Sequence, residues 1–187
     1  MRIVGGTFRG RALAGPKTDA IRPTTDRIRE TLFNILQHGH AQVLNGARVL
    51  DLFSGTGALG LEAMSRGGKY CLFVEEGTEG RGLLRTNIEA LGLTGATRIF
   101  RRDATKLGPI GAIQPFDVLF ADPPYGKRLG EAALAEARRE GWLAPDALCI
   151  LEEAASAPFD LPKGFVIHDT RSTGETVLRF LRLADPA

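Results

Sequence analysis

The chain has 187 residues, of which 43% are hydrophobic and 25% are charged, and its formal net charge is +2. This balance is typical of a soluble globular protein, and no apolar run approaches the length of a membrane-spanning helix. The first residues show no secretory leader, so we expect a cytoplasmic protein. Cys71 and Cys149 lie in apolar runs, which predicts buried, reduced thiols and argues against a disulfide or a metal site.

Positive charge is concentrated at the N-terminus. Residues 1–30 contain seven basic and three acidic side chains, so the rest of the chain carries a small net negative charge. A basic segment joined to a near-neutral body favours contact with a polyanion, although ordinary solvated arginines are the alternative. We therefore expect one domain over residues 1–187, in which residues 1–25 form a basic extension that binds nucleic acid.

The N-terminal part of the chain predicts a small β-hairpin followed by a helix. Residues 2–4 and 7–9 flank Gly5 and Gly6, a pattern typical of two short strands joined by a tight turn. A loop rich in Pro and Gly follows, and residues 24–26 can cap the first helix. The apolar residues that share one face of this helix are Ile28, Leu32, Ile35 and Leu36.

Strands and helices then alternate along the chain. Short apolar strands are predicted at 47–52, 70–74, 97–101, 117–121 and 147–152. Amphipathic helices are predicted at 58–66, 78–91 and 131–140. This alternation predicts a doubly wound, mostly parallel α/β sheet covered on both faces. Two last strands, at 165–171 and 176–183, flank a turn and predict an antiparallel hairpin that brings the sheet to seven strands.

A glycine-rich segment, residues 51–60, follows the first strand of this alternation and opens a helix. Its glycines match the dinucleotide-binding spacing G-x-G-x-x-G at Gly55, Gly57 and Gly60. That spacing is weak evidence alone, and Asp51 decides between ligands. Its carboxylate would repel a dinucleotide phosphate but attract the cationic cofactor S-adenosylmethionine. We place Phe53 in the same predicted cofactor site, and a capping role is the alternative for Asp51.

Acidic residues also follow the next two strands. A carboxylate at such a strand end can accept hydrogen bonds from both hydroxyls of an adenosine ribose, and Glu75 lies nearer its strand than Glu76. Both candidate ligands contain this ribose, so the acid does not distinguish them. Asp103 and Ala104 follow the third strand and would hold the adenine amine, with a simple turn as the alternative for Asp103.

The motif Asp122-Pro123-Pro124-Tyr125, after the strand at 117–121, carries the clearest chemical signal. Two prolines fix two φ angles and remove two donors, so the nearby carbonyls are held as acceptors. An amino group on a conjugated base is a poor nucleophile because its lone pair is delocalised. Asp122 and the Pro123 carbonyl would accept its two N–H protons and free that lone pair, while Tyr125 would stack on the base. A rigid turn with a core tyrosine is the alternative.

A longer motif, RPTTDRIRETLFN, occupies residues 22–34, after RIVGG at residues 2–6 and RGR at residues 9–11. Together with the motifs at 51–57 and 122–125, it resembles the bacterial RsmD family over nearly the whole chain. The resemblance implies the class I methyltransferase fold, S-adenosylmethionine as cofactor and no metal. It also implies methylation of guanine N2 in 16S ribosomal RNA, at the nucleotide usually numbered 966, within a small-subunit assembly intermediate.

The resemblance implies further site residues. In related amino-methylases the segment before the glycine loop closes over the methionine end of the cofactor, which suggests Thr24, Thr25 and Arg29 as cofactor neighbours. The candidate RNA contacts are Arg9, Arg11 and Arg22, with Lys127 and Arg128 beside the 122–125 motif. The family pattern has a second acid where this chain has Gly77, which leaves open whether Glu75 or Glu76 binds the ribose.

Three other functions remain open on the sequence. The Asp-Pro-Pro-Tyr motif does not choose the base, so adenine-N6 methylation of DNA or RNA is the nearest alternative. An NAD-dependent oxidoreductase would use the glycine loop, but we find no acid or base for hydride transfer. An RNA-binding module without catalysis would have no need of the motif at residues 122–125.

Overall fold

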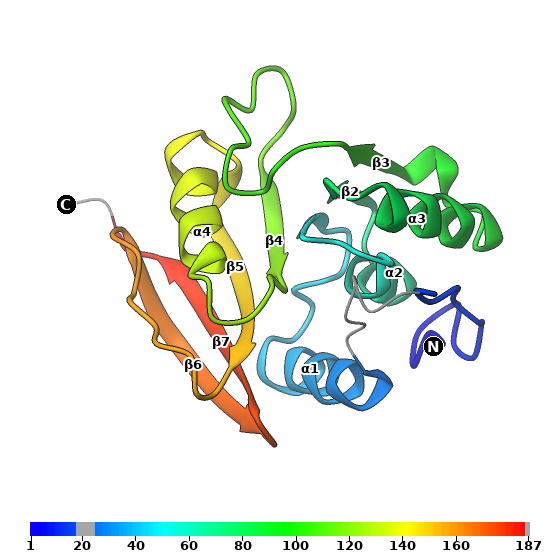
Figure 1. Cartoon of the computed structure of the whole chain (residues 1–187), viewed down its shortest axis with the longest axis horizontal. Coiled ribbons are helices and arrows are strands. Elements are labelled where there is room, and N and C mark those ends of the chain that lie inside the picture. Colours follow the sequence, from blue (N-terminus) through cyan, green and yellow to red (C-terminus); the bar gives the residue numbers. More distant parts are fainter. Residues whose placement is uncertain (18–24, 186–187) are drawn as a thin grey trace.

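The computed structural model describes residues 1–17 and 25–185, and a seven-stranded sheet forms its centre (Figure 1). The strands are β1 Arg48–Leu52, β2 Tyr70–Val74, β3 Thr97–Phe100, β4 Phe116–Ala121, β5 Leu143–Ala154, β6 Phe165–Thr173 and β7 Thr176–Leu183. The helices are α1 Asp26–Gly39, α2 Ala58–Ser65, α3 Thr78–Ala90 and α4 Leu129–Arg139, with a short 3₁₀ helix at Thr94–Ala96.

The strand order in the sheet is β3-β2-β1-β4-β5-β7-β6. Strands β1 to β5 run parallel to one another, whereas β7 runs antiparallel to both β5 and β6. The predicted doubly wound, mostly parallel sheet with a C-terminal antiparallel hairpin is confirmed. Because β1 pairs with both β2 and β4, the chain reverses its direction of travel across the sheet at β1, which is where ligands bind in open α/β sheets.

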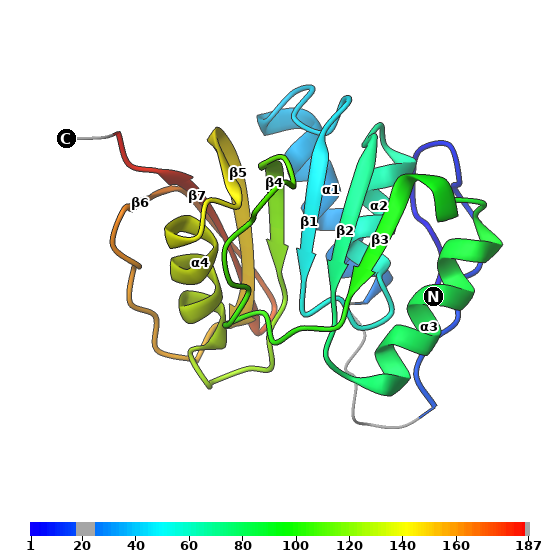
Figure 2. The same cartoon turned by 90° about the horizontal axis from the view of Figure 1, so that it is seen from above.

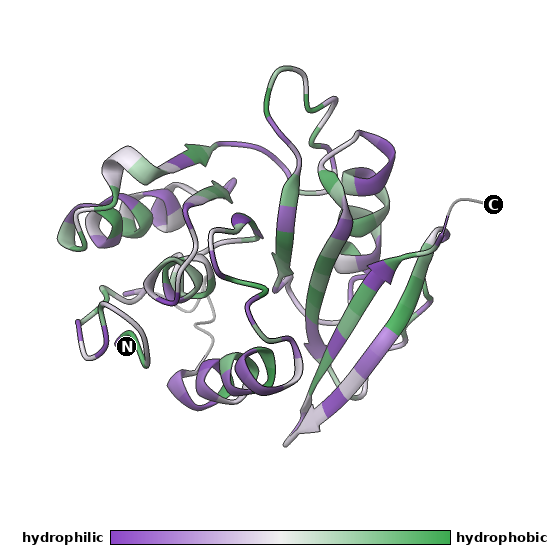
Figure 3. Ribbon diagram, turned by 180° about the vertical axis from the view of Figure 1, so that it is seen from behind, coloured by the Kyte–Doolittle hydropathy of each residue, from purple (hydrophilic) through white to green (hydrophobic). Residues whose placement is uncertain are grey.

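Helices cover the two faces of the sheet unequally (Figure 2). Helices α1, α2 and α3 pack on one face, where Phe33, Leu61 and Leu84 join one apolar core. Helix α4 packs on the other face over β4 and β5, and Leu134 and Trp142 join the second core. The central strands are mainly hydrophobic, whereas α1 is hydrophilic on its outer side (Figure 3). The segment at residues 101–115 covers the rest of the second face without a helix.

The strand β5 begins earlier than predicted. Its first residue, Leu143, pairs with Phe116, and the register then shifts before Leu148 pairs with Val118. Pro145 lies within this shift. Since proline cannot donate to a strand ladder, it is tolerated at an irregularity and hides the start of the strand from sequence patterns.

The N-terminal segment does not form the predicted hairpin around Gly5 and Gly6. An isolated antiparallel bridge joins Arg2 to Ala12, and the Ile3 N–H donates to the Arg11 carbonyl at 2.9 Å. The reversal therefore spans residues 4–10 as a wide loop. The glycine pair serves close packing instead, because a Cβ on Gly6 would lie 2.0 Å from the Ser65 carbonyl oxygen of α2.

The N-terminal extension is fastened to the helices rather than projecting from them. The backbone N–H groups of Val4 and Gly5 each donate to the buried Glu62 carboxylate at 2.9 Å. Ile3 and Leu13 are buried in the first core. The basic extension therefore presents its exposed arginines from a fixed backbone.

Cys71 and Cys149 are buried free thiols, as predicted. Burial raises the pKa of Cys149 to about 12, so this thiol stays protonated near neutral pH. Among the helices of the described residues, none is both long and apolar enough to span a membrane. Within residues 1–17 and 25–185, no group of three or more His, Cys, Asp or Glu side chains is arranged to hold a metal ion.

Candidate active site

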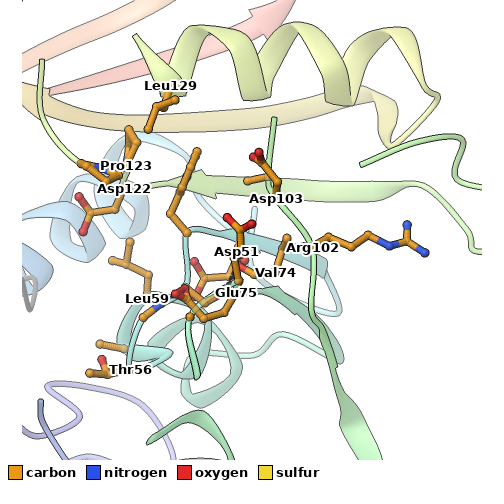
Figure 4. A pocket seen from close by; sticks show the side chains of 18 of the residues that line it. Asp51, Thr56, Leu59, Val74, Glu75, Arg102, Asp103, Asp122, Pro123 and Leu129 are labelled. Atoms are coloured by element: carbon orange, nitrogen blue, oxygen red, sulfur yellow. Dashed lines mark hydrogen bonds between the residues drawn. The ribbon is translucent and has the colours of Figure 1, made fainter. Parts of the chain in front are cut away.

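A pocket of about 680 Å³ opens at the carboxyl ends of the parallel strands, where the chain reverses direction across the sheet. Its walls come from the segments that follow β1, β2, β3 and β4. Asp122 and Pro123 lie on one side of the pocket and Asp103 on another, with Asp51 and Glu75 between them (Figure 4). Three motifs that are far apart in the sequence therefore meet at one site.

The glycine loop is held by Asp51, whose side chain is 1% exposed. Its Oδ2 accepts a hydrogen bond from the Gly60 N–H at 3.0 Å, and its backbone carbonyl accepts one from the Ser54 hydroxyl at 2.5 Å. Phe53, in the left-handed region at φ 55°, lines the pocket with Gly55. Asp51 thus holds the glycine loop, which is the capping role given as its alternative, and it also lines the pocket.

The pocket concentrates negative charge around Asp51. Burial raises the pKa of Asp51 well above its ordinary value, and the charges of Asp122 and Glu75 raise it further against the opposing hydrogen bond from Gly60. A ligand phosphate would add to this repulsion, whereas a cationic group would relieve it. The electrostatics of the site therefore favour a cationic ligand over a dinucleotide.

Glu75 is the better placed of the two acids that follow β2. It is half-buried, and its Oε2 accepts a hydrogen bond from the Gly55 N–H of the glycine loop at 3.3 Å. Burial raises its pKa, while the Gly55 and Gly77 N–H groups lower it. Glu76 is exposed, and its backbone carbonyl accepts a hydrogen bond from Arg81.

Gly80 has a role in the site that sequence reasoning missed. A Cβ on Gly80 would lie 2.8 Å from Cγ and 2.9 Å from Cδ of Glu75. The sequence pattern showed only a residue that weakens the start of a helix. In the structure, this glycine leaves the space that the Glu75 side chain occupies beside α3.

Asp103 forms the turn that was the alternative role predicted for it, and it also lines the pocket. Its Oδ1 accepts hydrogen bonds from the Thr105 N–H at 2.8 Å and the Thr105 hydroxyl at 2.7 Å, and these bonds lower its pKa. Asp103 and the buried Ala104 both line the pocket. The carboxylate is therefore a turn residue that remains charged at the edge of the site.

The motif at residues 122–125 is fastened to strands that are distant in sequence. The Tyr125 hydroxyl donates to Glu152 Oε1 at 3.0 Å and lies 3.3 Å from the Thr176 hydroxyl. The next N–H, of Gly126, donates to Glu153 Oε1 at 3.2 Å. Tyr125 lines the pocket and is not a core residue. In the sequence, these contacts were indicated only by the two acids, Glu152 and Glu153, near the end of the apolar strand β5.

Arg29 does not line the pocket, contrary to the expectation that it neighbours the cofactor. Its guanidinium is fully buried and forms ion pairs with Asp26 and with Glu62, the latter at 3.3 Å. It also donates to the Arg2 carbonyl at 2.9 Å. A buried cation must be paired, and Arg29 finds its partners among α1, α2 and the extension.

The remaining predicted residues that the structure describes are exposed and lie on several elements. Thr25 caps α1 by accepting a hydrogen bond from the Ile28 N–H, while Thr24 and Arg22 lie outside the described residues. Arg9 and Lys127 are exposed. Arg11 is also exposed, and it donates to the Ala90 carbonyl at the end of α3 at 2.5 Å.

Asn87 connects the N-terminal extension to the pocket and was not predicted. Its side chain is 1% exposed, and its amide oxygen accepts a hydrogen bond from the Ala14 N–H at 2.7 Å. The amide nitrogen donates to the Ala14 carbonyl at 3.1 Å and to the Thr56 carbonyl at 2.9 Å. Thr56 lines the pocket, so one buried amide links the extension to the glycine loop.

Known proteins match this chain over nearly its whole length. A family model described as "Conserved hypothetical protein 95" matches residues 1–182. The "Ribosomal RNA small subunit methyltransferase D" of Escherichia coli strain K12 is 36% identical over 180 residues, which cover 96% of this chain and 88% of that protein. The Haemophilus influenzae protein of the same name is 32% identical over 176 residues, which cover 93% and 89%. A solved structure, "Putative methyltransferase yhhF" from Escherichia coli, is 36% identical with a TM-score of 0.83 and covers 98% of this chain and 97% of that chain.

The chain belongs to the RsmD family. This confirms the resemblance drawn from residues 22–34 and from the motifs of the glycine loop and residues 122–125. The fold is that of class I methyltransferases, with the antiparallel β7 as predicted. The family match at residues 1–182 includes the N-terminal extension.

Proposed function

We propose that this RsmD-family chain transfers a methyl group from S-adenosylmethionine to the N2 amine of a guanine in small-subunit ribosomal RNA. The observation that carries the proposal is that Asp122, Pro123 and Tyr125 line the same pocket as Asp51 and Glu75. An acceptor pair for an amine and an acidic site for a cationic cofactor thus share one cavity. Two relatives named as small-subunit rRNA methyltransferases support the RNA substrate.

The residues of the glycine-loop side fit the proposed cofactor. Glu75 would accept hydrogen bonds from the ribose hydroxyls, and Asp103 would accept one from the adenine amine. Asp51 would face the positively charged methionine part, where its buried carboxylate favours a cation. The cofactor supplies an electrophilic methyl group when bound.

The residues of the 122–125 motif would prepare the nucleophile. The Asp122 carboxylate and the Pro123 carbonyl would accept hydrogen bonds from the two N–H groups of the amine, which localises the nitrogen lone pair. Tyr125 would present its ring to the base while its hydroxyl stays bound to Glu152. The rate enhancement would come mainly from holding the amine in line with the methyl group. The target base must leave any stacked helix to reach these residues.

Methylation of defined RNA substrates tests the proposal. Unmodified 16S rRNA would be incubated with labelled S-adenosylmethionine, both free and assembled into small subunits, and the products digested to nucleosides for mass analysis. We expect N2-methylguanosine, with faster turnover on a partly assembled subunit than on free RNA. N6-methyladenosine would replace the guanine assignment with the adenine alternative, and absence of any methylated nucleoside would overturn the enzymatic function.

A further inference from the structure

Three exposed arginines lie at and just after β3, the edge strand nearest the pocket, and none of them was among the predicted RNA contacts. They are Arg98, Arg101 and Arg102, here called the β3 arginine cluster. The guanidinium carbons of Arg98 and Arg102 lie 4.7 Å and 4.6 Å from the ring centroid of Phe100. An aromatic ring thus holds two guanidinium groups in place, which lowers the entropy lost when they bind an anion.

The β3 arginine cluster is connected to the rim of the pocket. Arg102 lines the pocket next to Asp103, and its Nη1 donates to the Leu107 carbonyl at 2.8 Å. Its side chain extends away from Asp51 and Glu75 (Figure 4). The cluster therefore presents positive charge just outside the acidic interior of the site.

The charge of the β3 arginine cluster is not neutralised within the protein. Across residues 1–17 and 25–185, no carboxylate forms a salt bridge with any of its three arginines. Arg128, beside the 122–125 motif, differs because it pairs with Asp160 and lies 3.8 Å from a Glu131 oxygen. An arginine already paired with two acids is a weaker anion site than an unpaired one.

The acidic pocket determines which anion the cluster fits. Asp51, Glu75 and Asp122 would repel a phosphate from the interior, while a base entering the pocket brings the phosphates of its own strand to the rim. Guanidinium groups bind phosphate oxygens in paired hydrogen bonds. We propose that the β3 arginine cluster binds phosphates of the RNA strand next to the target nucleotide. This proposal rests on RNA being the substrate, as in the proposed function.

A matched pair of double variants tests the proposal. Arg98→Gln/Arg101→Gln removes two charges at the β3 edge. Arg138→Gln/Lys163→Gln removes two exposed charges that form no salt bridge within residues 1–17 and 25–185, one near the end of α4 and one just before β6, the opposite edge strand. Free and assembled 16S rRNA are the probes, with RNA binding measured at several salt concentrations and methyl transfer measured over a range of RNA concentrations. Calorimetry with S-adenosylhomocysteine checks that each variant keeps its folded cofactor site.

We expect the β3 variant to raise the KM for RNA about tenfold or more, with kcat nearly unchanged. The slope of log affinity against log salt should fall by roughly 1.4 to 1.8, as expected for two lost phosphate contacts. Equal effects of the two double variants would overturn the proposal, since general charge would then explain them, and so would an unchanged KM and salt slope. If the wild-type protein transfers no methyl group to RNA, the proposed function is wrong. The RNA-binding comparison of the two double variants would still test whether the β3 arginine cluster binds RNA.

Discussion

The two sides of the pocket are built in different ways. The cofactor side, formed by the glycine loop and Glu75, is held by contacts among the segments that line it, such as Gly60 of α2 to Asp51 of β1 and Gly55 to Glu75. The side formed by residues 122–125 is held from outside, through Tyr125 and the acids at the end of β5. Changes on the first side should therefore alter cofactor affinity, and changes on the second should alter turnover.

The largest expected effect is a loss of turnover on substitution of Asp122, which belongs to the 122–125 side of the pocket. Asp122→Ala removes the proposed acceptor for the amine, and we expect turnover on rRNA to fall by at least about a hundredfold. Affinity for S-adenosylhomocysteine should stay within a few-fold, as measured by calorimetry, because Asp122 belongs to the 122–125 side. Near-normal turnover in this variant would reduce Asp122 to a turn residue.

Glu75 gives the matching test of the cofactor side. Glu75→Ala should weaken S-adenosylhomocysteine binding by about 1–3 kcal/mol, since a hydrogen bond to a charged group is lost. Glu76→Ala is the control, and its exposed side chain should contribute within about 0.5 kcal/mol. If Glu76→Ala has the larger effect in calorimetry, the ribose acid is misassigned.

Alanine substitutions at two glycines of α3 test the cofactor side through the space beside Glu75. Gly80→Ala should push the Glu75 side chain out of place and weaken cofactor binding several-fold, because its Cβ would lie 2.8 Å from that side chain. Gly82→Ala is a matched control, since nothing lies within 4 Å of its Cβ. That control should leave affinity unchanged and stabilise the helix by about 0.5–1 kcal/mol. Thermal unfolding and calorimetry of both variants distinguish the space requirement from the helix propensity.

A last effect, on stability rather than on binding or turnover, is a pH dependence that originates at Asp51. Burial raises its folded-state pKa above the unfolded-state value, so the ligand-free fold binds the proton of this carboxyl more tightly than the unfolded chain does. Its contribution to the free energy of unfolding is present below the unfolded-state pKa of about 3.9 and is lost as pH rises through the raised folded-state pKa. Asp51→Asn should remove this loss. Thermal unfolding without cofactor should show its stability relative to wild type increasing from acidic to neutral pH, and a constant difference would contradict the argument.

Sequence patterns predicted the elements of this fold because most of their signals are local. Alternating apolar strands and helices located the sheet, and the motifs at 51–60 and 122–125 located the pocket at the strand ends. The local pattern also favoured Glu75 over Glu76 because Glu75 lies nearer its strand, and both acids line the pocket. These predictions needed only chain order and the known position of ligands in open α/β sheets.

Features that depend on distant contacts could not be predicted in the same way. Tyr125 and Glu152 are 27 positions apart, and Asn87 and Ala14 are 73 apart. Arg29 looked like a site residue because its motif is specific to the family, but a buried acid on α2 determines its place. The hairpin at Gly5 and Gly6 was wrong because small residues permit close packing as readily as they permit turns.

The way the N-terminal extension is fastened has a consequence for the order in which this chain folds during synthesis. Val4 bonds to Glu62, 58 positions later, and Ala14 bonds to Asn87, 73 positions later. The extension leaves the ribosome before α2 and α3, so it has no docking surface until those helices have emerged. Contacts of such large sequence separation form late, because a long loop must close before they contribute. The extension is made before α2 and α3, and it docks only after these helices have formed.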